Sequence, residues 1–239
     1  MKAFTFTIPW FNQVQILVLS TLLYLLMTYV IDSKSKKSFP NNYKEIQKTW
    51  IKISLYLGFC LILSYLGFLE SFTFPPRMPL LSASITFCSL YLILRSPLYD
   101  LFKKIGPAKI VLFQIWRFIP ESVIFLNVFT GIQPNIMTIT GRNFDLIVPI
   151  SAPIIYWLFK QKFIPASWLL YWNVVSLFIL FHTLMVGVLS APFPFQQYDV
   201  YPSNAIVGFF PMTLIPLFFV PLAITSHLLG IILLKNDEH

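Results

Sequence analysis

Three polar side chains interrupt one long apolar run of the sequence, at residues 108–129. Gln114, Arg117 and Glu121 are spaced so that all three project from one face of an α-helix, which turns by about 100° per residue. An ionised side chain at the centre of a membrane helix costs roughly 2.5–3.5 kcal/mol. Such residues therefore face the interior of a helix bundle, where they find partners.

Two interpretations of this cluster stay open. In the first, Arg117 and Glu121 lie four positions apart, pair with each other and play a purely structural role. In the second, the cluster binds a ligand or a proton. Pro120 favours the second, because it removes a helix hydrogen bond and frees the carbonyl of Trp116 for water or a ligand.

Polar residues also interrupt the later apolar runs. Asn173 and His182 lie in the sixth run, on opposite faces of the predicted helix, and His227 lies in the last run. At about 1.5 Å of rise per residue, Asn173 and His227 lie near 10 Å from one membrane face, at the depth of Gln114. Glu121 and His182 lie near 20 Å.

A third polar group, Arg142, Asn143 and Asp145, follows the fourth run and is expected at the outer mouth of the bundle. Stacked layers of this kind suit a polar cavity or a proton-linked path. The alternative for each histidine is a structural role, in which one hydrogen bond satisfies the buried ring and no ligand or proton is bound. The candidate ligand or proton site comprises Gln114, Arg117, Glu121, Asn173, His182 and His227.

Several kinds of chemistry find no support in the sequence. Cys60 and Cys88 both lie in apolar runs, so neither a disulfide framework nor a zinc site is indicated. The last apolar run has no central lysine for retinal, and no Walker loop or H-E-x-x-H motif is present. We therefore expect no metal and no cofactor, and assign no catalytic residue.

The composition indicates which elements must position these residues. Of 239 residues, 57% are hydrophobic and 11% are charged, whereas soluble domains carry roughly 25% charged residues. Membrane helices need about 20 apolar residues. The sequence predicts an all-α, polytopic membrane protein with a single domain, 1–239, and about seven spans. They lie near 11–31, 51–69, 79–95, 108–129, 145–160, 167–190 and 207–234.

The basic residues predict the orientation of this bundle. With the N-terminus outside and the C-terminus in the cytoplasm, thirteen basic residues lie on the inner side and three on the outer side, as the positive-inside rule requires. The inner ones are Lys34, Lys36, Lys37, Lys44, Lys48, Lys52, Arg95, Lys103, Lys104, Lys109, Lys160, Lys162 and Lys235; the outer ones are Lys2, Arg77 and Arg142. A footprint for nucleic acid is excluded by this placement between apolar runs.

The connections are expected to differ in character. Residues 33–50 form a polar, lysine-rich inner loop over anionic headgroups, and residues 96–106 form a short interfacial helix. Outside, residues 192–203 are rich in aromatics and proline and form either a lid or an aromatic belt. The prolines of the last span predict a bent or partly unwound helix: Pro211, Pro216 and Pro221.

Four features of the C-terminal half occur together: Gln114-Ile-Trp-Arg117, Gly131-Ile-Gln-Pro134, Gly141 to Asp145, and a proline-rich last helix with His227. In these features the chain resembles a group of uncharacterised bacterial multi-pass membrane proteins. The group's second loop reads more like Gly-x-Gly-Asp, from which Gly141-Arg-Asn-Phe-Asp145 departs. The resemblance implies a multi-pass fold, and a location in the bacterial inner membrane is expected.

The leading functional prediction is an outward-opening intramembrane pocket that binds or moves a small polar, anionic or amphipathic molecule. Arg117 would supply positive charge, and Glu121 and His182 would exchange protons or hydrogen-bond. One alternative is a membrane-embedded enzyme that acts on a lipid with Glu121 and His182 as acid and base. Another is a sensor or subunit whose basic inner loops dock a cytoplasmic protein. The expected partners are the bilayer and a small-molecule or lipid ligand.

Overall fold

The protein is all-helical, and the computed structural model describes residues 7–236, in which no β-strand occurs. Lys2, counted above as an outer basic residue, lies outside the described residues, as do the ends of the predicted domain. The helices are α1 (Trp10–Ser38), α2 (Tyr43–Tyr65), α3 (Arg77–Leu94), α4 (Leu98–Ile105), α5 (Pro107–Phe113), α6 (Phe118–Phe129), α7 (Ile147–Lys160), α8 (Ala166–Leu189) and α9 (Val220–Asn236). Shorter turns of 3-10 helix lie at Pro40–Asn42, Gln114–Arg117, Asn135–Met137 and Asn204–Gly208, and a π-helical turn at Ile215–Phe219.

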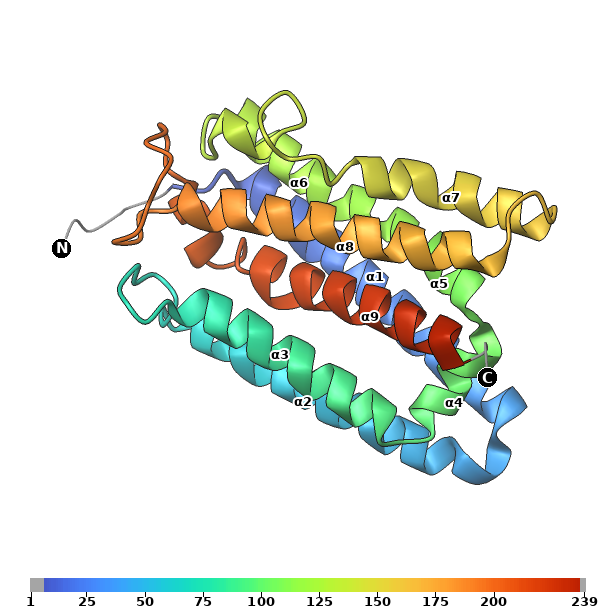
Figure 1. The fold of residues 1–239 in the computed structure, drawn as a ribbon. Helices are drawn as coiled ribbons and strands as arrows, with labels where there is room; N and C mark the ends of the chain where they lie inside the picture. Colours follow the sequence, from blue (N-terminus) through green and yellow to red (C-terminus); the bar gives the residue numbers. More distant parts are fainter. Residues whose placement is uncertain (1–6, 237–239) are drawn as a thin grey trace.

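The long helices run up and down, so that their connections gather at two ends of the bundle (Figure 1). At one end, here called the loop end, lie the connections 66–76, 130–146 and 190–214. At the other, here called the lysine end, lie the connections 39–42, 95–106 and 161–165 and the last turn of α9. The names reflect the long loops of the first end and the lysines of the second.

Within residues 7–236, six helical stretches are long and apolar enough to cross a membrane. They are Trp10–Ser38, Pro40–Tyr65, Arg77–Leu94, Pro107–Phe129, Ala166–Leu189 and Ile215–Asn236. The fifth predicted span, 145–160, corresponds to α7, which is apolar but has only 14 residues. These stretches indicate a membrane-embedded protein.

The last span begins later than the predicted residue 207. Asn204–Gly208 form a 3-10 turn, and the apolar stretch becomes continuously helical only from Ile215. Its first turn is π-helical and contains Pro216, which cannot donate the backbone hydrogen bond of a regular α-helix. The expectation of an irregular last span is confirmed at this turn, while Pro211 lies before the helix.

The predicted polar loop at 33–50 is wrong. Helix α1 continues to Ser38 and α2 begins at Tyr43, so the connection is short. Lysine and carboxylate side chains one turn apart support these helix ends: Lys36 Nζ lies 2.8 Å from Asp32 Oδ2. The polar residues therefore show where the chain leaves its apolar surroundings, but they do not show where the helix ends.

The short helix expected within 96–106 is present as α4. Leu98 and Leu101 are buried, and Phe102 and Ile105 pack against the same apolar cluster, which includes residues of α1, α2 and α9. Its apolar face thus covers the lysine end of the bundle.

Helix α9 lies at the centre of the bundle (Figure 1) and is the most buried of the six long stretches. It packs against α3, α5 and α8. Gly230 permits close contact with α8, because a Cβ atom added there would lie 3.2 Å from Asn173 Oδ1. This central position takes the polar side chains of α9, Ser226 and His227, into the interior.

Candidate functional site

A buried ion pair between Arg117 and Asp145 forms the centre of the polar interior. The Arg117 guanidinium is fully buried and binds both carboxylate oxygens of Asp145, with 3.0 Å between Nε and Oδ2. The Arg117–Glu121 pairing considered from the sequence is wrong. The Arg117 guanidinium is instead taken by Asp145, and the Glu121 carboxylate accepts from Asn143.

His227 is the second partner of Arg117. Its Nε2 lies 2.9 Å from Arg117 Nη1, and its Nδ1 lies 2.9 Å from Asn173 Oδ1. Because a guanidinium can only donate, Nε2 accepts and Nδ1–H donates to Asn173. Asn173 Nδ2 in turn donates to the Leu169 carbonyl, at 2.8 Å. The chain of hydrogen bonds therefore fixes the histidine tautomer and orients the guanidinium.

Glu121 is held by Asn143. The Asn143 amide donates to both Glu121 oxygens, at 3.0 and 3.2 Å, and to the Met137 carbonyl. Its own oxygen accepts from Thr183 Oγ1 at 3.0 Å and from the Asp145 backbone N–H at 2.9 Å. Asn143 thus links the glutamate to the ion pair, and no ion pair of residues 7–236 includes Glu121.

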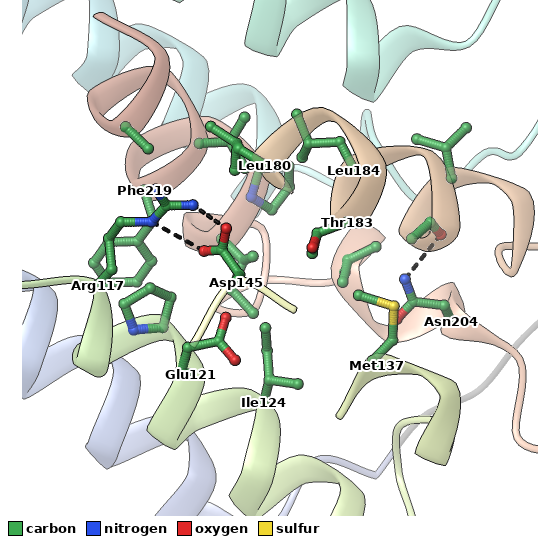
Figure 2. Close-up of a pocket in the computed structure, with 18 of the residues that line it drawn as sticks. Arg117, Glu121, Ile124, Met137, Asp145, Leu180, Thr183, Leu184, Asn204 and Phe219 are labelled. Carbon is green, nitrogen blue, oxygen red and sulfur yellow. Dashed lines mark hydrogen bonds and ion pairs between the residues drawn. The ribbon is translucent and has the colours of Figure 1, made fainter. Parts of the chain in front are cut away.

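Four residues of this network border a cavity of about 100 Å³: Arg117, Asp145, Glu121 and Thr183. Figure 2 shows the Glu121 carboxyl directed toward the same space as the ion pair. Trp116 also lines the cavity, and its Nε1 has no hydrogen-bond partner among the described residues. The space accommodates several water molecules but is smaller than the roughly 300–1,000 Å³ of sites for larger ligands.

A second polar group reaches the cavity from the loop end. Gln133 Nε2 donates to Asn204 Oδ1 at 2.9 Å, and both residues line the cavity. Asn127 donates to Gln133 at 3.1 Å and accepts from Asn12 of α1 at 2.9 Å. These amides are not among the residues predicted from the sequence. The sequence feature that could have predicted this group is the presence of four amide side chains within or beside apolar runs: Asn12, Asn127, Gln133 and Asn204.

The structure assembles most of the predicted site residues and leaves two outside. Gln114 is buried and donates to Ser226 Oγ at 2.8 Å, beside His227 in the chain. His182 is exposed on α8, where it stacks on Phe144 with ring centroids 5.4 Å apart, and Arg142 is exposed and donates to the Tyr198 hydroxyl. Neither His182 nor Arg142 lines the cavity, so Glu121 and His182 do not form an acid–base pair there.

The aromatic loop 192–203 packs against the loop end. Phe193 is buried, with its ring 5.1 Å from that of Phe72 in the 66–76 connection, whereas Tyr201 is fully exposed. Arg142 joins this loop to the 130–146 connection through Tyr198. Residues 7–236 contain no group of three histidine, cysteine or carboxylate side chains that could hold a metal ion.

No curated protein and no solved structure matches the chain. A protein family, described as Domain of unknown function (DUF8737), matches residues 77–235. The matched region begins at α3 and contains all the candidate site residues, while α1 and α2 precede it. Because the match covers more than half of the 239 residues, the chain belongs to this family, the Domain of unknown function (DUF8737).

Proposed function

We propose that the protein binds and moves protons, or a similarly small polar solute, through the cavity beside Glu121. The observation that carries this proposal is the Glu121 carboxyl group, which has no ionic partner within residues 7–236 and borders a mostly apolar cavity inside the bundle. Ionisable residues at membrane depth mark ion and proton paths, because their burial is otherwise unfavourable. Glu121 is the group that takes up and releases the proton.

The arrangement of charge favours a proton over an anionic ligand. The positive charge of Arg117 is matched by Asp145, and a third hydrogen bond goes to His227. Little of that charge is left for an anion, and the ionised Glu121 carboxylate would repel one. The cavity volume of about 100 Å³ supports a water chain or a solute of a few atoms.

The proposal includes an orientation. The excess of basic residues at the lysine end supports a cytoplasmic location for that end, with the N-terminus outside and seven crossings that include α7. The cavity is lined by Gln133 and Asn204 from the loop end, which supports an opening to the outside in this orientation. The inner membrane of a bacterium is the proposed location.

Proton flux into proteoliposomes tests the function. Full-length protein is reconstituted with a pH-sensitive dye inside the vesicles, and a potassium gradient with valinomycin sets the membrane potential. We expect a flux above that of empty vesicles, which Glu121→Gln lowers at least tenfold. Glu70→Gln is the matched control, because Glu70 is an exposed carboxylate in the 66–76 connection and does not line the cavity. Absence of flux, or equal flux in the two variants, would refute the proposal.

A further inference from the structure

A second and larger cavity lies between the helices toward the lysine end. Its volume is about 760 Å³, within the roughly 300–1,000 Å³ of typical ligand sites. Helices α1 to α5 and α9 all contribute to its walls, and most of the lining side chains are apolar. On α1 the lining extends from Tyr24 to Ser38, which corresponds to about 20 Å along the helix axis.

The interior of this cavity offers few free polar groups. Tyr24 donates to Ser54 Oγ at 2.7 Å, and Ser226 accepts from Gln114 and donates to the Ala223 carbonyl. Among the lining hydroxyls, Thr225 Oγ1 is buried and has no hydrogen-bond partner in the described part of the chain. A ligand that fills the interior is therefore predominantly hydrocarbon.

Four lysines line the same cavity at the lysine end: Lys34, Lys37, Lys104 and Lys109. They come from the last turns of α1, from α4 and from the first turn of α5, and all four are exposed. The ion pairs of residues 7–236 include none of them, whereas Lys36 and Lys48 are paired with carboxylates on their own helices. None of the four therefore has a carboxylate partner within residues 7–236, although the Lys104 ammonium lies over the Phe39 ring, 5.5 Å from its centroid.

We propose that this cavity binds an anionic phospholipid, with its phosphate among the four lysines and its hydrocarbon chain along the apolar walls. An apolar cavity about 20 Å long with unpaired cations at one end is complementary to such a molecule in both shape and charge. A free phosphate fits less well, because the lysines are exposed to solvent and the apolar volume would stay empty. The site is separate from the Glu121 cavity and does not depend on the proposed proton flux.

Trp50 lines this cavity and provides a probe. Full-length protein is reconstituted in phosphatidylcholine vesicles containing increasing fractions of phosphatidylglycerol with brominated chains, which quench tryptophan fluorescence on contact. Brominated phosphatidylcholine serves as the uncharged comparison. We expect phosphatidylglycerol to reach half-maximal quenching at an at least threefold lower mole fraction, and Trp50→Phe to remove that difference.

Charge variants distinguish the site from general attraction to a basic surface. Replacing the four lining lysines by Gln should make the two quenching curves coincide. Replacing Lys44, Lys52, Lys103 and Lys162 by Gln removes the same charge from exposed positions outside the cavity and should leave the difference unchanged. Native mass spectrometry of the same proteins should find bound phosphatidylglycerol on the wild type and the control, and not on the first variant.

Three results would overturn the proposal. The first is equal quenching by the two lipids in the wild-type protein. The second is an excess of phosphatidylglycerol quenching that survives in the variant lacking the four lining lysines. The third is relief of quenching by soluble glycerol phosphate, which would show that the lysines recognise the headgroup without the chain.

Discussion

Removing one partner of the Arg117–Asp145 pair should destabilise the protein more than removing both. The side chains are 1% and 7% exposed, so the survivor of a single substitution is a buried charge without its counter-ion. Arg117→Met and Asp145→Ala are each expected to cost about 3–5 kcal/mol. In the double variant no charge is stranded, and the remaining defect is His227 Nε2 without its donor, which costs about 1–3 kcal/mol.

Equilibrium unfolding in mixed micelles, with a rising mole fraction of sodium dodecyl sulfate, measures these differences as a double-mutant cycle. Glu121→Gln is the internal control on the same cavity, because it keeps an oxygen acceptor for Asn143 and breaks no ion pair. We expect it to change the free energy of unfolding by less than about 1 kcal/mol. Single-variant costs below that value, or a double variant whose cost equals the sum of the singles, would refute the assignment of the pair.

Three further predictions follow from the packing and the charge distribution. His227→Phe leaves Arg117 Nη1 and Asn173 Oδ1 unpaired and should lower the free energy of unfolding by about 1–3 kcal/mol. His182 is exposed, so His182→Phe should change the free energy of unfolding by no more than about 0.5 kcal/mol. Gly141→Ala would place a Cβ 2.5 Å from backbone atoms and should destabilise the protein by at least about 1–3 kcal/mol. In Gly58→Ala the new Cβ on α2 meets nothing within 4 Å, so this variant should be about 0.5–1 kcal/mol more stable. Equal melting temperatures for the two histidine variants, or for the two glycine variants, would contradict the geometry. Reporter fusions should be cytoplasmic after Lys37, Lys104 and Lys162 and external after Pro76, Asn135 and Tyr198, and an external signal after Lys37 or Lys104 would contradict the orientation.

Hydropathy predicts the long helices well, because the chain cannot cross a membrane except as a helix with its backbone hydrogen bonds satisfied internally. The third predicted span, 79–95, differs from α3 (Arg77–Leu94) by at most two residues. The sequence does not predict that α1 continues to Ser38 or that α2 begins at Tyr43, because hydropathy indicates where a helix leaves the membrane and not where it ends. The ion pair of Asp32 and Lys36 continues the helix beyond the apolar run.

The chemistry of the site was visible in the sequence, but its pairing was not. Arg117, Glu121 and His227 stand out because charged or polar residues are rare within apolar runs. Their partners depend on which helices become neighbours. Arg117 lies 28 residues from Asp145 and 110 from His227, separations that no helical periodicity relates. His182 shows the limit of the same reasoning, since it is also a polar residue within an apolar run but its side chain is exposed on α8.

The π-helical turn Ile215–Phe219 links the two cavities physically. Pro216 and Phe219 line the cavity beside Glu121, while Leu217 and Phe218 line the larger cavity at the opposite side of the same turn. Irregular turns of this kind shift more easily than a regular α-helix, because their hydrogen-bond ladder is already interrupted. We therefore expect a lipid chain that displaces Leu217 or Phe218 to move Phe219 as well. If both proposals hold, proton flux should rise or fall with phosphatidylglycerol content, and that dependence should disappear when the four lining lysines are replaced.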